Sequence, residues 1–224
     1  MTRGFDAIIV GAGQAGPALA ARLTGAGMQV ALIERHLVGG TCVNTGCKPT
    51  KTLVASAYAA HMARRAADYG LKLGPVGIDM PAVAARARKV ILDSRTGGEE
   101  WLAGMKGLTF LRGHARFEAP GRMRVGDDVL EAPRIFLNVG GRAAVPDMPG
   151  VDQVDYLTNS NIVGLETVPE HLIVVGGSYI GLEFAQMYRR FGARVTVVEM
   201  GPRLIGREDP EISSAIRAIL EGEG

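Results

Sequence analysis

The sequence has little cysteine, no long apolar run and almost no net charge, and each shortage excludes a class of protein. Two cysteines in 224 residues are too few for a scaffold held together by disulphides. The balance of 25 basic and 23 acidic residues gives no general reason to expect nucleic acid or a bilayer surface as partner. No stretch approaches the ~20 apolar residues of a membrane span, and the first apolar run, residues 7–10, is too short for a signal peptide. We therefore expect a cytoplasmic protein, in which paired cysteines are reactive or metal-binding rather than structural.

Apolar residues and glycine are plentiful. Hydrophobic residues make up 47% of the chain, which excludes general disorder, and the 31 glycines follow no collagen-like period. The length fits one large domain or one and a half ordinary ones. Short apolar runs followed by glycines and helical stretches predict an α/β fold with buried parallel strands.

A long-range repeat organises these elements. A strand at residues 5–10 is followed by glycines at 11–16, a helix at 17–26 and a strand at 30–33 that ends at Glu34. The same series recurs 165 residues later, as a strand at 172–175, glycines at 176–181, a helix at 182–191 and a strand at 194–198 that ends at Glu199. The repeat predicts two Rossmann-like dinucleotide-binding units.

Further elements are predicted between the two units. Helices are expected at 45–69 and 80–103, and the short runs at 109–111, 115–117, 123–125 and 129–131 predict a small antiparallel meander. A strand at 134–139 and a linker at 146–150 place a domain boundary near 148, between residues 1–148 and 149–224. Two strands are too few to bury the faces of the second unit, so we expect an N-terminal fragment of a longer protein that exposes apolar surface.

Each glycine of the first turn has a distinct expected task. Gly11 permits the tight turn, Gly13 lets the backbone approach a pyrophosphate, and Gly16 allows close packing of helix on strand. The helix N-terminus then presents unpaired amides to the phosphates, and Glu34 accepts hydrogen bonds from ribose hydroxyls. An ordinary strand-to-helix turn is the alternative, and the complete strand, helix and acid context disfavours it.

The second turn keeps Gly176 and Gly181 but has Ser178 at its middle position, where the side chain either crowds a pyrophosphate or donates to it. Glu199 favours the free 2′-hydroxyl of NAD and repels the 2′-phosphate of NADP. Arg203 and Arg207 follow closely and act in the opposite direction. We expect NADH to be preferred over NADPH.

The stretch from 39 to 51 contains both cysteines. Cys42 and Cys47 are five residues apart, and Pro49 fits the first turn of a helix, which places Cys47 at or just before a helix N-terminus that stabilises a thiolate. Lys51 shares a face with Cys47 if that helix runs through both. A zinc site, a pair of inert buried thiols and a chance pair are the alternatives. No second cysteine pair exists to complete a zinc site, and no metal-ligand set is predicted.

The stretch Gly40-Thr41-Cys42-Val43-Asn44-Thr45-Gly46-Cys47, with Pro49 and Lys51, resembles the redox-active signature of the pyridine nucleotide-disulphide oxidoreductases. Lys48 and Thr50 are most similar to the mercuric reductase-like group. The resemblance implies an FAD-dependent enzyme, homodimeric at full length, that passes electrons from NAD(P)H to a small-molecule disulphide or a soft metal ion such as Hg(II).

The resemblance also implies roles for single residues. Cys47 is the thiolate beside the flavin, Cys42 exchanges with substrate, Lys51 pairs with Glu183, and Tyr179 covers the flavin. The implied FAD contacts are Gly11, Gly13, Gly16, Glu34, Thr41, Lys51, Gly113, His114, Ala115 and Gly140. The implied NAD(P)H contacts are Gly176, Ser178, Tyr179, Gly181, Glu199 and Arg203. The family's dimerisation domain and catalytic histidine, which the partner subunit supplies, would lie beyond residue 224.

Two other functions stay open. One is a flavin oxidase or quinone reductase in which the cysteines are incidental, and the other is a non-catalytic nucleotide-binding protein. Trp101, in a predicted helix, is expected to pack in the core, and His61 is expected to be a surface residue or one with a satisfied side chain.

Overall fold

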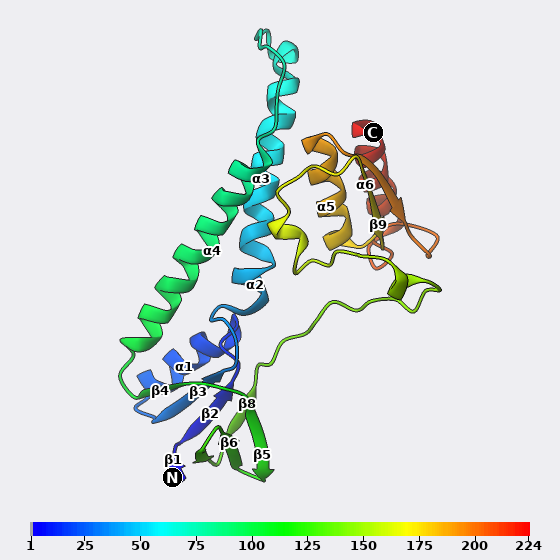
Figure 1. Cartoon of the computed structure of the whole chain (residues 1–224). Coiled ribbons are helices and arrows are strands. Elements are labelled where there is room, and N and C mark those ends of the chain that lie inside the picture. Colours follow the sequence, from blue (N-terminus) through cyan, green and yellow to red (C-terminus); the bar gives the residue numbers. More distant parts are fainter. Residues whose placement is uncertain (1) are drawn as a thin grey trace. The chain divides into compact units, whose positions relative to one another are not determined.

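The computed structural model describes residues 2–224, which form two compact units (Figure 1). The first comprises the residues up to 49 together with 89–160, and the second comprises 50–88 and 161–224. The division falls inside two long helices, α3 (Cys47–Arg64) and α4 (Met80–Ala103). The chain therefore does not divide into compact units at a single point.

A four-stranded parallel sheet forms the centre of the first unit. Its strands lie in the order β4 (Leu108–Arg112), β3 (Val30–Glu34), β2 (Ala7–Val10) and β8 (Ile135–Leu137). Helix α1 (Ala15–Gly25) connects β2 to β3. This order is that of one half of a doubly wound dinucleotide-binding fold, so the expected α/β class is confirmed.

Both faces of this sheet are covered, which explains the continuous apolar runs of its strands. Ile9 and Leu32 point into a core shared with α1 and the end of α4, where Leu102 is buried. Their sequence neighbours Ile8 and Ile33 point to the other face and pack against β6 (Arg122–Val125) and β7 (Asp128–Glu131).

The second sheet differs from the expected meander. Strands β5 (Ala115–Ala119), β6 and β7 are antiparallel as predicted, and β1 (Thr2–Gly4) joins them parallel to β7. The run at 109–111 was wrongly assigned to the meander, because it belongs to β4 and pairs parallel with β3. Helix α4 precedes β4 and supplies the crossover connection that parallel pairing needs. The sequence of a short apolar run does not show which strand it will pair with, so the run itself gave no sign of this pairing.

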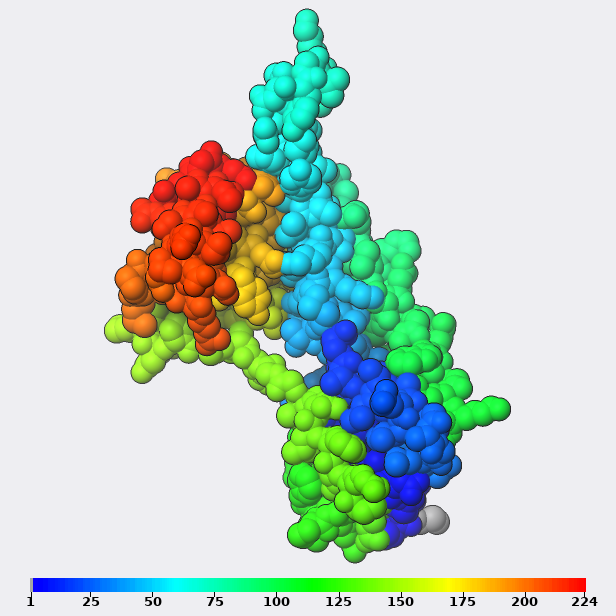
Figure 2. Space-filling view, turned by 180° about the vertical axis from the view of Figure 1, so that it is seen from behind, coloured from blue at the N-terminus to red at the C-terminus, as the bar shows by residue number. Residues whose placement is uncertain are grey.

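The predicted helix at 45–69 is α3 followed by the 3₁₀ turn η1 (Ala66–Tyr69), and the predicted helix at 80–103 is α4. The segment between them protrudes beyond the helix ends, and Leu71 and Leu73 there are largely exposed (Figure 2). The expectation that Trp101 packs in the core is wrong: it is 50% exposed, because its neighbour Leu102 takes the buried face of α4.

The second unit is built on two parallel strands, β9 (His171–Val175) and β10 (Arg194–Val198), with helices α5 (Tyr179–Phe191) and α6 (Pro210–Glu223). Its core joins α3 and α4 to α5 through Leu53, Met80 and Phe184. The other face of the strands exposes Ile173, Val175 and Val198. Two 3₁₀ turns, η2 (Val151–Gln153) and η3 (Ile162–Gly164), lie in the segment before β9. Over residues 2–224 no helix has the length and apolar character to cross a bilayer.

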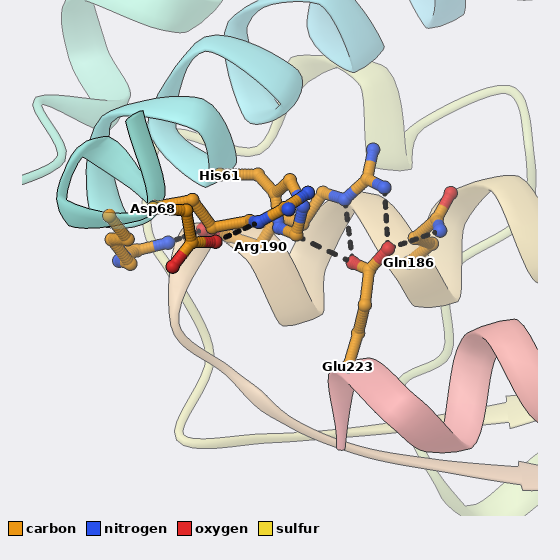
Figure 3. Close-up of polar contacts among 7 residues, drawn as sticks. His61, Asp68, Gln186, Arg190 and Glu223 are labelled. Atoms are coloured by element: carbon orange, nitrogen blue, oxygen red, sulfur yellow. Dashed lines mark hydrogen bonds and ion pairs between the residues drawn. The ribbon is translucent and has the colours of Figure 1, made fainter. Parts of the chain in front are cut away.

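A polar clamp joins three helices of the second unit (Figure 3). The Arg190 guanidinium of α5 donates two hydrogen bonds, of 2.6 and 2.7 Å, to the Glu223 carboxylate of α6. Gln186 donates a third, of 2.9 Å, and His61 of α3 lies 3.8 Å from the same carboxylate. The Arg190 and Glu223 side chains are only 12% and 17% exposed, so their charges depend on each other for compensation.

We expect Glu223→Gln to lower the free energy of unfolding by about 3 kcal/mol, because it leaves the Arg190 charge largely buried without a counter-charge. Urea unfolding of the purified protein measures this. Glu221→Gln, on the same helix, is the matched control: its carboxylate pairs with Arg217 at an exposed i,i+4 position, and the expected loss is below about 0.5 kcal/mol. Equal losses in the two variants would contradict the clamp.

The contribution of Glu223 should also depend on pH. Hydrogen bonds from Arg190 hold the pKa of this carboxyl below its ordinary value. A lowered pKa in the folded state means that the stabilisation is fully present above the unfolded-state pKa and is lost as the pH falls through the folded-state value. The stability difference between the wild type and Glu223→Gln should therefore narrow steadily under acid conditions, which unfolding curves across the acid range will show.

Candidate functional site

The predicted nucleotide contacts of the first unit gather at one edge of its parallel sheet. Gly11 follows β2, Glu34 ends β3, Gly113 follows β4 and Gly140 lies just beyond β8. All four are therefore at the carboxyl ends of neighbouring parallel strands, where open α/β sheets bind their ligands.

In the first glycine turn, the backbone conformation of Gly11 and the lack of space at Gly11 and Gly16 both require glycine. Gly11 has φ of +107°, and a Cβ there would lie 2.2 Å from the carbonyl oxygen of Asn138. A Cβ on Gly16 would lie 2.0 Å from the carbonyl oxygen of Gly11. The turn is thus closed by contacts between backbone atoms, which leave no room for a side chain.

Glu34 connects the strand end to this turn. Its Oε2 accepts a hydrogen bond of 2.8 Å from the N–H of Ala12, and its Oε1 accepts one of 2.8 Å from the N–H of His36. Each carboxylate oxygen has a second acceptor site, so these bonds hold the carboxylate in place and leave it able to accept from ribose hydroxyls.

The stretch 113–115 lies beside Glu34, because the Gly113 N–H donates to the Glu34 carbonyl at 2.9 Å. The next side chain, His114, contacts Arg35 at 3.4 Å between Nδ1 and Nη1. The sequence assigned no role to Arg35, and only the pairing of β3 with β4 brings it to His114.

The dithiol segment lies in the first unit and joins two helices. Thr41 and Cys42 are in the short helix α2 (Gly40–Asn44), and Cys47 is the first residue of α3. The two cysteines are thiols in contact, with the Cys47 N–H directed at the Cys42 sulphur. Burial, and next the neighbouring Cys47 sulphur, raise the pKa of the Cys42 thiol, so Cys42 retains its proton at neutral pH.

Two further predicted residues meet in the second unit. Lys51, one turn after Cys47 in α3, donates from Nζ to the Glu183 carboxylate of α5. Tyr179 is the first residue of α5 and is 68% exposed. The helix does run through Cys47 and Lys51, so these two residues share a face.

The second glycine turn repeats the hydrogen bonds of the first. Gly176 has φ of +105°, and a Cβ on Gly181 would lie 2.3 Å from the Gly176 carbonyl oxygen. Glu199 accepts from the N–H of Gly177 at 2.6 Å and from the N–H of Gly201 at 2.7 Å. These bonds, the one from Gly201 foremost, hold the pKa of the Glu199 carboxyl below its ordinary value, so it is charged at neutral pH.

A cavity of about 530 Å³ lies between α5, β10 and α6, and both Glu199 and Arg203 line it. The Arg203 guanidinium is exposed and donates to the Gly206 carbonyl at 3.4 Å. Arg203 and the charge of Glu199 therefore border one pocket. Nowhere in residues 2–224 do three metal-ligating side chains gather closely enough to hold an ion.

Sequence reasoning missed three backbone positions. Gly40 approaches Gly13 so closely that a Cβ on Gly40 would lie 2.9 Å from the Gly13 Cα. A Cβ on Gly177 would lie 2.5 Å from Cδ2 of Leu204, so the Leu204 side chain would have to move. Ile205 has a positive φ, of +40°, and among residues 2–224 no other non-glycine residue has a positive φ. The glycines were visible as a signal, but no sequence pattern indicates a strained isoleucine.

Comparisons with known proteins agree with this geometry. The sequence model described as pyridine nucleotide-disulphide oxidoreductase matches residues 5–224. A mercuric reductase of Streptomyces lividans is 37% identical over 227 residues, covering 99% of this chain and 48% of that protein. A dihydrolipoyl dehydrogenase of Chlorobaculum parvum is 35% identical over 97% of this chain and 47% of that protein.

Among solved structures, the HOCl-induced flavoprotein disulfide reductase RclA from Escherichia coli matches with a TM-score of 0.84 and 34% identity. The match covers 98% of this chain and 47% of that one, and the chain spans about half the length of the curated relatives above. The agreement in sequence and structure runs over nearly all of the chain, from the first glycine turn to the last helix. The chain therefore belongs to the pyridine nucleotide-disulphide oxidoreductase family.

Proposed function

We propose that the whole protein is an FAD-dependent oxidoreductase that passes electrons from NAD(P)H, through the Cys42–Cys47 pair, to a disulphide or to a soft metal ion such as Hg(II). The observation that carries this proposal is the contact of two thiols at the start of α3, in a segment whose backbone packs against the glycine turn. Relatives named mercuric reductase and flavoprotein disulfide reductase support the two acceptor classes.

The residues of the first unit fit FAD. At Gly11 and Gly16 the turn leaves space only for backbone, Gly13 has no side chain to hinder the approach of a pyrophosphate, and Glu34 has acceptor sites left for a ribose. Further contacts are assigned to Thr41, Lys51, to 113–115 and to Gly140. Bound FAD would supply the transfer of electrons between the nicotinamide and the dithiol.

The two cysteines would divide the chemistry between them. Reduction opens the bond between the sulphurs and leaves a thiol at Cys42, whose raised pKa keeps its proton, and a thiolate at Cys47. After a base removes that proton, Cys42 attacks a substrate disulphide, forms a mixed disulphide with one of its sulphurs and releases the other as the first substrate thiol, which takes the proton back from the base. Cys47 then attacks Cys42, which releases the second substrate thiol and restores the protein disulphide.

We propose that this base comes from the partner subunit of a homodimer, as the resemblance implies. Because such a site needs thiols that cycle, we place the protein in a reducing compartment, the cytoplasm. We assign residues 1–148 to an FAD-binding domain and 149–224 to part of an NAD(P)-binding domain.

In the second unit we assign Gly176, Ser178, Gly181 and Glu199 to NAD(P)H. Tyr179 is exposed at the start of α5, which fits a side chain that covers the flavin and moves when nicotinamide binds. The charged Glu199 favours the ribose diol of NADH over the 2′-phosphate of NADPH.

The cysteine roles predict a spectroscopic difference. In the full-length protein, two-electron reduction should produce a long-wavelength absorption band from the Cys47 thiolate beside the flavin. Cys47→Ser should abolish this band and retain bound flavin. Cys42→Ser is the matched control and should show the band before any reductant is added, because its Cys47 has no disulphide partner and stays a thiolate beside the oxidised flavin. A reduced wild type without the band would count against the assignment.

Cofactor preference gives a second test. Glu199→Ala should reduce the ratio of kcat/KM for NADH to that for NADPH by about tenfold, because it removes a charged acceptor of ribose hydrogen bonds. Glu208→Gln, an exposed acid of the same loop, should leave the ratio within about twofold. Steady-state kinetics with both nucleotides decide this. An unchanged ratio in Glu199→Ala would overturn the assignment of Glu199.

A further inference from the structure

Asn44 lies between the two cysteines, at the end of α2, and nothing above gives it a role. Its Nδ2 atom donates two hydrogen bonds, to the carbonyl oxygen of Val38 at 3.0 Å and to that of Gly40 at 2.9 Å. One amide group therefore closes the segment 38–44 into a ring of backbone and side chain that contains Cys42.

The same segment contacts the glycine turn. The Gly39 N–H donates to the Ala12 carbonyl at 2.8 Å, and Gly40 lies so close to the Gly13 Cα that a Cβ on Gly40 would collide with it. Both carbonyl groups that Asn44 holds therefore flank the backbone that touches the turn. Gly39 and Gly40 have φ of +94° and +56°, a conformation that glycine adopts readily and other residues rarely adopt.

We propose that Asn44 is a positioning residue that couples the nucleotide turn to the dithiol. By fixing the carbonyls of Val38 and Gly40, it sets where α2 begins relative to Gly13, and thus where the helix presents Cys42 to Cys47. The inference rests on the proposed function, because it concerns how FAD affinity and disulphide formation depend on one side chain.

The chemistry of the amide makes the proposal specific. Both bonds of Asn44 are donated by its nitrogen, and its Oδ1 is buried without a hydrogen-bond partner anywhere in residues 2–224. Asn44→Ala removes the two donors. Asn44→Asp keeps the shape but directs a carboxylate oxygen at two carbonyl oxygens, which repel it, so the damage should exceed that of alanine.

The test uses the full-length protein and two readouts that need no turnover. One is the dissociation constant of FAD from the apoprotein. The other is the equilibrium in which the protein dithiol and oxidised glutathione give the protein disulphide and two molecules of reduced glutathione. We expect Asn44→Ala to weaken FAD binding and to lower the disulphide equilibrium constant by about tenfold each, and Asn44→Asp to exceed Asn44→Ala in both.

Thr45→Ala is the matched control, since it trims the adjacent side chain and keeps the backbone bond from Thr45 to Thr41. Both readouts should stay within about twofold of the wild type. If Asn44→Asp does not fold, Asn44→Ser carries the test, because its hydroxyl restores a single donor and should give about half the logarithmic loss of Asn44→Ala.

The outcomes distinguish a failure of the coupling through Asn44 from a failure of the proposed function. A disulphide equilibrium that is unchanged in the Asn44 variants, or one that shifts without any change in FAD affinity, overturns the coupling through Asn44. A wild-type protein that binds no FAD or forms no Cys42–Cys47 disulphide overturns the proposed function, and the coupling with it.

Discussion

The close approach of two backbone segments is the constraint on which the rest of the first unit depends. The Gly13 turn and the Gly40 turn approach to a distance at which a single Cβ would collide. This contact brings a nucleotide-binding turn at the end of a strand to a loop that carries two thiols. Glycine is required on the Gly40 side, where a Cβ would collide with the Gly13 Cα and where φ is positive.

The two nucleotide-binding units show what such a contact imposes on sequence. Each has a strand, a glycine turn with φ near +105° and an acid whose carboxylate accepts the N–H one residue past the first glycine. They differ where the dithiol loop packs against the first turn. Gly13 faces Gly40 there, whereas its counterpart Ser178 is exposed.

The loop after Glu199 packs against the second glycine turn through Ile205, where the first unit uses Gly39. Ile205 donates its N–H to the Gly177 carbonyl at 2.8 Å, much as Gly39 does to Ala12. It adopts a positive φ at a cost of about 1–3 kcal/mol for a branched side chain. The surrounding contacts of Leu204 and Ser213, whose hydroxyl donates to the Leu204 carbonyl at 2.7 Å, hold the loop in place despite that cost.

The thiols are unequal for a reason that lies in their surroundings. Cys42 is half-buried in α2, and its pKa is raised, whereas Cys47 is exposed at the first residue of a long helix. A raised pKa makes Cys42 a poor nucleophile unless a base removes its proton. Lys51 and Glu183 add a pair of charges to the same helix and to α5.

Local patterns in the sequence determined the elements, the repeat and the family, because glycine spacing, apolar runs and the cysteine stretch are local signals. They placed β2, α4 and β10 closely, and they assigned to Gly11, Glu34 and Cys47 roles that stay predictions. They could not decide that residues 109–111 join the parallel sheet, that Trp101 faces outward or that Asn44 holds two carbonyls. Those outcomes depend on which segments, distant in sequence, come into contact, and only the packed chain fixes them.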